Sequence, residues 1–176
     1  MVVAVAAAGD EQVWHGRGWI DLRQDLFVPR KTTPCSYLVK VPVNVPDQAH
    51  ELALTGRRLD VAGSWDGHQF TVSSAAFAQN QEEPSYVGTP PHPGESMSWA
   101  EGRALESSRP PEAMERLLGA SAMPAIRENP SHGATHLSLE VTYVDRELED
   151  WRAAHPLGRF VLFRATIGQT GRWLFD

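Results

Sequence analysis

The alternation of hydrophobic and polar positions is clearest between residues 58 and 75. Two stretches rich in β-branched and aromatic residues, 58–65 and 68–75, flank the pair Asp66-Gly67. Such a pair supplies the positive φ angles of a tight primed turn, so the segment predicts a β-hairpin. Apolar residues recur at every second position of each arm, which predicts one buried face. We therefore expect Val61 and Val72 to point into a core from adjacent strands.

Similar patterns extend over the rest of the first half. Strand-like runs cover residues 13–22, 26–28 and 37–43, and a short run over 47–54 predicts a helix before the hairpin. This order of elements is that of an OB-like, partly open Greek-key β-barrel. The match is one of topology, and β-sandwiches can give a similar order. We predict an OB-like barrel over residues 1–78.

The composition changes at residues 79–98, which are polar and rich in proline and therefore predict a linker or a long functional loop. Residues 99–176 then predict a small α+β unit with a β-α-β-β core. Ser108 is expected to cap a helix over 110–118, whereas 120–133 shows no regular pattern. The remaining elements are expected at 135–144 (strand), 146–154 (helix), 160–167 (strand) and 172–175 (strand). The fold class is thus α+β and mostly β, and the pattern leaves open whether the two units share one core.

Composition and charge restrict the function classes. The chain has 176 residues, 41% of them hydrophobic, and it includes six tryptophans, which is typical of a folded globular protein. A net charge of −6 excludes a general attraction to nucleic acid or anionic lipid. The net charge is −1 through Phe77 and −5 from Ala78 onward, so nucleic acid would be expected only at the first half.

The location is expected to be the cytoplasm, with no association with membranes. Cys35 is the single cysteine, which excludes an internal disulfide and fits a reducing compartment. The apolar opening, residues 1–8, lacks a basic leading segment, so we interpret it as a flexible end or a first strand. No later apolar run has the length needed to cross a bilayer. Only two of the 16 basic residues are lysines, a bias that indicates the composition of the source genome, and we expect a bacterial protein.

No catalytic motif is present, which favours a protein without catalytic activity or cofactor. The sequence contains no Gly-x-Ser-x-Gly, Walker or Gly-x-Gly-x-x-Gly pattern. The weaker of two alternatives is a metal-dependent hydrolase that uses His132, His136 and Glu140, because two imidazoles and a carboxylate can hold a divalent metal with one position open for water. On a strand, however, intervals of four residues spread these groups over more than about ten ångströms.

A second alternative is single-stranded nucleic-acid binding by the barrel. Its aromatic residues could stack on bases while its cations follow the phosphates. Against this, counter-ion release requires cations in excess of nearby anions, and the first half carries no net positive charge. The candidate residues are Arg30, Lys31, Tyr37, Lys40, Arg57, Arg58 and Trp65.

The sequence favours a binding module that engages another macromolecule, with protein preferred over nucleic acid. Its proline-rich loop carries Tyr86 and ends at Trp99, and the final residues include Arg172, Trp173 and Phe175. Tryptophan, tyrosine and arginine dominate the energetics of protein interfaces. A terminal strand can also pair with the sheet edge of a neighbour. We therefore expect a protein partner or a second copy of this chain.

Overall fold

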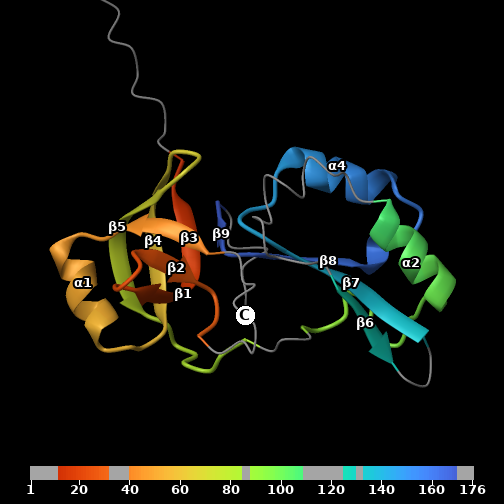
Figure 1. Cartoon of the computed structure of the whole chain (residues 1–176), viewed down its shortest axis with the longest axis horizontal. Helices are drawn as coiled ribbons and strands as arrows, with labels where there is room; N and C mark the ends of the chain where they lie inside the picture. The colour runs from red at the N-terminus through yellow and green to blue at the C-terminus, as the bar shows by residue number, and fades with distance from the viewer. Residues whose placement is uncertain (1–11, 32–39, 85–87, 109–124, 130–132, 170–176) are drawn as a thin grey trace, which may run out of the picture.

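A computed structural model describes residues 12–31, 40–84, 88–108, 125–129 and 133–169, with the backbone alone for 125–129. The fold is mixed α+β and mostly strand, with a six-stranded sheet and a three-stranded sheet (Figure 1). The predicted helix over 110–118 and the predicted strand over 172–175 lie outside the described residues. None of the described helices combines the length and the apolar character that crossing a bilayer requires.

The larger sheet is partly ring-like. Its first five strands are β1 (Trp14–Asp21), β2 (Leu26–Val28), β3 (Val41–Asn44), β4 (Leu59–Trp65) and β5 (Phe70–Phe77), and helix α1 (Asp47–Leu54) connects β3 to β4. Strand β1 pairs with both β2 and β4, β2 pairs with β3, and β5 pairs with both β4 and β3. Strands β3 and β5 are parallel, and the other pairs are antiparallel.

Apolar side chains fill the inside of this ring. Phe27 and Phe70 are fully buried, and their rings meet edge to face with centroids 6.2 Å apart. A Cβ atom at Gly16 would overlap the ring of Phe27, so the glycine leaves room for that ring in the core. Val61 and Val72 are both buried on adjacent strands. The expectation that these two valines point into a core is therefore confirmed.

The turn of the β4–β5 hairpin is longer than the predicted two residues. Residues 66–69 connect the strands, and among them only Gly67 has a positive φ, of 97°. The carboxylate of Asp66 accepts hydrogen bonds from the backbone N–H groups of His68 and Gln69, both at 2.7 Å. These contacts hold the pKa of Asp66 below its ordinary value. The positive φ angles predicted at Asp66 and Gly67 are thus found at Gly67 alone, and the Asp66 N–H donates to the Gln69 carbonyl at 3.3 Å while its carboxylate satisfies the next N–H groups.

The second sheet contains β6 (Ala125–Asn129), β7 (Gly133–Val141) and β8 (Val161–Ala165). Strand β7 pairs antiparallel with β6 and parallel with β8, and helix α4 (Arg146–Ala154) and the short 3₁₀ helix η1 (Gly158–Phe160) lie between β7 and β8. The β-α-β order predicted from residue 135 onward is confirmed. The prediction that 120–133 lacks regular structure was wrong, because β6 forms between Pro124 and Pro130 as a strand too short to show a clear alternation.

Helix α2 (Trp99–Ser107) is a further element that was not predicted. A capping box begins it, in which Ser98 Oγ accepts from the Glu101 N–H at 3.2 Å and Glu101 Oε2 accepts from the Ser98 N–H at 2.8 Å. The bond from the Ser98 N–H holds the pKa of Glu101 below its ordinary value. Ser108, which was predicted to begin a later helix, is the C-cap of α2.

Removing the capping box is expected to weaken the fold modestly and in a pH-dependent way. Ser98→Ala should lower the free energy of unfolding by about 1 kcal/mol at neutral pH, as for other N-cap serines. Because the folded-state pKa of Glu101 is depressed, its stabilising contribution is present above the unfolded-state pKa and is lost as the pH falls through the folded-state value. The Ser98 N–H that donates to Glu101 is still present in Ser98→Ala, so the pH dependence is tested with Glu101→Ala. Urea denaturation of wild type and Glu101→Ala at pH 7 and at about pH 3 should show the difference in unfolding free energy narrowing in acid. An unchanged difference would contradict this assignment.

The two sheets share one stretch of chain. After Thr166, β8 continues into β9 (Ile167–Gly168), which pairs antiparallel with β1 at the edge of the larger sheet. Ile167 is fully buried and belongs to the core inside the ring. The Thr166 N–H still donates to Val141 of β7 at 3.0 Å. The second half of the chain therefore supplies a strand and a core residue to the first (Figure 1).

Candidate functional site

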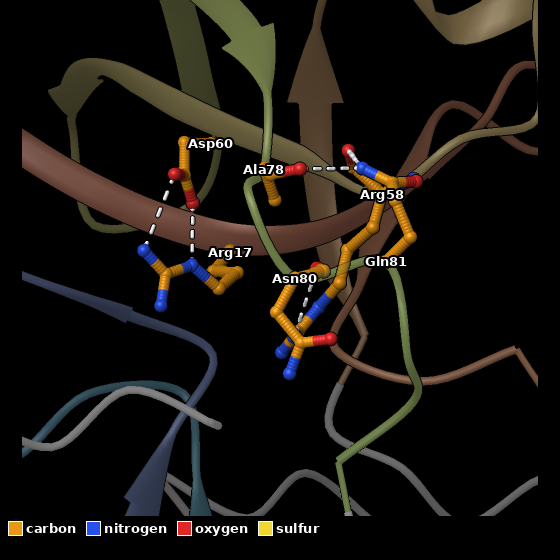
Figure 2. Close-up of polar contacts among 6 residues, drawn as sticks. All are labelled: Arg17, Arg58, Asp60, Ala78, Asn80 and Gln81. Atoms are coloured by element: carbon orange, nitrogen blue, oxygen red, sulfur yellow. Dashed lines mark hydrogen bonds and ion pairs between the residues drawn. The ribbon is translucent and has the colours of Figure 1, made fainter.

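Two of the cations proposed to contact nucleic acid are buried inside the protein. Arg58 lies with its guanidinium 5.6 Å from the ring centre of Trp19 and donates to the Asn80 carbonyl at 3.5 Å. Its backbone N–H donates to the side chain of Gln81 at 2.9 Å (Figure 2). Arg30 is also buried and donates to Glu140 of β7. Both arginines thus hold segments of this chain together.

The other described residues proposed to contact nucleic acid do not share one set of contacts. Lys31 lies 5.7 Å from the Trp19 ring centre, on the same ring as Arg58, and Arg57 stacks over Phe77 at 3.9 Å. Lys31, Lys40 and Arg57 are exposed. Trp65 instead packs against Tyr143, with ring centres 6.3 Å apart, and Tyr37 lies outside the described residues.

The proposed metal ligands have different surroundings. His136 is fully buried, and its Nδ1 lies 3.0 Å from Thr135 Oγ1. The Glu140 carboxylate contacts two guanidinium groups, and His132 lies outside the described residues. Within the part of the chain that the structure describes, no three His, Cys, Asp or Glu residues gather closely enough to hold a metal ion.

An ionic cluster consisting of Arg30, Glu140 and Arg164 joins the two halves of the chain. Arg30 Nη2 donates to Glu140 Oε1, and Arg164 Nη1 lies 3.9 Å from the same oxygen. The side chains of Arg30, Glu140 and Arg164 are 2%, 15% and 6% exposed. Charges withdrawn from water to this degree depend strongly on their partners. The cluster therefore has a structural explanation, and sequence reasoning had assigned Arg30 and Glu140 to two unrelated sites.

Trp99 is the predicted binding residue whose surroundings are best defined. Its side chain is 43% exposed, whereas Met97 just before it is buried. Met97 and Ala134 exchange two backbone hydrogen bonds, at 2.8 and 3.0 Å, which fasten the end of the loop to β7. The capping box then fixes the first turn of α2. The other predicted binding residues, Tyr86, Arg172, Trp173 and Phe175, lie outside the described residues.

Gly133 makes this attachment of the loop possible. It has a φ of 90°, and a Cβ atom there would overlap the carbonyl oxygen of Met97. The backbone of the loop therefore approaches the start of β7 more closely than a larger residue would allow. As a result, the partly exposed Trp99 follows a segment that is fixed by the bonds of Met97 and by the capping box.

An open pocket of about 590 Å³ lies beside the same loop. The loop contributes Pro91 and His92, and the segment that joins α4 to β8 contributes most of the remaining wall. Sequence reasoning missed this pocket because its two walls are some sixty residues apart in the chain. The described lining residues are Pro91, His92, Arg152, Ala153, His155, Pro156, Gly158, Arg159 and Val161.

The fold and the site together define a mixed α+β protein, mostly strand, with a partly ring-like sheet, an exposed tryptophan at the start of α2 and a pocket lined in part by the preceding loop. The chain matches no protein-family model, no curated protein and no solved structure.

Proposed function

We propose that this protein is a binding module without catalytic activity, and that it engages another protein through Trp99 and the adjoining loop, residues 88–98. The observation that carries the proposal is the exposure of Trp99 between two fixed points, the Met97–Ala134 hydrogen bonds and the capping box. Tryptophan is among the residues most enriched at the energetic centres of protein interfaces. A protein partner accounts for a large aromatic side chain held in water.

Rigid presentation favours this function on energetic grounds. Binding has to overcome the entropy lost when side chains and loops become ordered, and a segment that is already ordered loses less. The first residues of α2 are fixed before any partner arrives, because the loop is joined to β7 and the helix is capped. Protein is also the better candidate than nucleic acid, since Arg30 and Arg58 are engaged within the protein.

We assign the ring-like sheet to the OB-like class as part of the same proposal. Its support is the order of pairing, β1-β2-β3-β5-β4 with a return to β1, and the position of α1 between β3 and β4. We further propose that the protein acts in the bacterial cytoplasm, in keeping with its single cysteine.

A crosslinking experiment followed by an affinity measurement tests the proposed interface. A photo-crosslinking phenylalanine analogue at position 99 should trap a discrete protein in host cells, whereas the same analogue at Leu54 should not. With the trapped protein purified, Trp99→Ala should weaken binding by about thirtyfold or more, the size expected for a central interface residue. Leu54→Ala is the matched control, because Leu54 is 68% exposed but lies on α1. Equal affinities of wild type and Trp99→Ala would refute the proposal.

A further inference from the structure

The pocket beside the loop differs in charge from the rest of the molecule. Among the described residues that line it there are two arginines and two histidines but no aspartate or glutamate. The whole chain has a net charge of −6. A concave region whose lining carries one sign of charge concentrates ligands of the opposite sign. The pocket therefore has the electrostatic character of an anion site on an acidic protein.

Local packing fixes the basic groups at the end of α4. The Arg152 guanidinium lies 5.1 Å from the ring centre of Phe163, and that of Arg159 lies 4.8 Å from the ring centre of Phe160. A Cβ atom at Gly158 would overlap the carbonyl oxygen of Arg152, so η1 lies directly against the last turn of α4. This close approach places Arg152 and Arg159 on one pocket although they come from different elements.

His155 adds a donor of defined orientation. Its Nδ1 accepts the Leu157 N–H at 3.1 Å, so the hydrogen of the ring is carried by Nε2. The ring also packs against Trp151, with centroids 6.0 Å apart. His92, contributed by the loop, is exposed. The lining thus includes up to four separate groups that can donate hydrogen bonds to an anion.

Two nearby features act against the binding of an anion. Glu95 pairs with Arg159 at 3.5 Å, but the two side chains are exposed and the pair is screened by water. The C-terminal end of α4 carries a partial negative charge, for which Arg152 is a favourable neighbour. That role explains one of the two arginines but not Arg159, which lies beyond the helix on η1.

We propose that this pocket binds a small organic phosphate monoester. A phosphate group offers three acceptor oxygens and up to two negative charges, which suits several donors better than a single carboxylate does. The pocket volume of about 590 Å³ lies in the range of small-molecule sites and exceeds what a phosphate group alone would fill. Pro91, Ala153, Pro156 and Val161 provide apolar walls for the organic part of the ligand.

Calorimetric titration of the full chain with adenosine monophosphate, ribose 5-phosphate and adenosine tests this site. Both phosphate esters should bind saturably with dissociation constants of about 1 mM or tighter, and adenosine should not bind. Arg152→Gln and Arg159→Gln should each weaken binding about tenfold or more, because each removes charged hydrogen bonds to phosphate. Arg146→Gln should have no effect, since Arg146 is on the same helix, highly exposed and outside the pocket lining.

Three results would overturn the proposal. The first is the absence of saturable binding by either ester, and the second is binding that both pocket variants retain in full. The third is binding of a phosphoserine peptide without binding of either small ester, which would identify a modified protein as the ligand. Arg159→Gln keeps the test decisive if Arg152→Gln disturbs folding, because the Arg159 side chain is 61% exposed.

Discussion

Phe27→Ala is expected to lower the free energy of unfolding by about 3–5 kcal/mol, the usual cost of truncating a buried phenylalanine. Phe27 is fully buried and meets Phe70 edge to face. Its ring also covers Gly16, which has no side chain that could fill the space left behind. The surrounding strands are hydrogen-bonded in a partial ring and cannot easily collapse into the cavity.

Urea denaturation followed by circular dichroism measures this loss. Phe77→Ala is the matched control, because it makes the same chemical change at an exposed position on β5. The control should lose far less stability than Phe27→Ala. Similar losses at both positions would show that Phe27 is not at the centre of the core.

Glu140→Ala is expected to be comparably damaging, with a loss of about 3–5 kcal/mol. The substitution removes the carboxylate that Arg30 and Arg164 share and leaves two buried positive charges close together. Because Arg30 follows β2 and Glu140 lies on β7, the loss also weakens the contact between the two sheets. Loss of a buried partner is far more costly than loss of an exposed one.

The pair Arg17–Asp60 provides the control for this substitution. Its atoms approach to 2.6 Å, but the side chains are 36% and 41% exposed (Figure 2). Asp60→Ala should therefore cost no more than about 1 kcal/mol. Chemical denaturation of both variants measures the contrast. If Glu140→Ala were as mild as Asp60→Ala, the cluster would not contribute to the stability of the fold.

Sequence patterns predicted those elements that are specified by residues close together in the chain. The hairpin arms on either side of Asp66 alternate clearly, and helix α4 begins at a side-chain cap, Asp145, as its sequence indicates. Helix α2 also carries a readable signal in Ser98 and Glu101, three residues apart. It was missed because the proline-rich composition before Trp99 suggested that irregular structure continued.

The candidate sites were less predictable because they depend on contacts between distant residues. Trp99 could be proposed as a binding residue from its type and its position after the loop. The pocket could not, since nothing in the sequence shows that His92 lies beside Arg159. Likewise, Arg30 was predicted to contact phosphate and Glu140 to bind metal, whereas their mutual contact explains why both are charged.

The stretch shared by the two sheets has a consequence for synthesis on the ribosome. Chains emerge from the N-terminus, so β1 to β5 leave the exit tunnel long before Ile167 can reach Gly16. Until then the nascent ring lacks one residue of its core, and the outer edge of β1 at Gly16 remains unpaired by β9. An exposed strand edge is a template for pairing with other chains. The emergence of Ile167, rather than the completion of the fifth strand, therefore ends this period of vulnerability to aggregation.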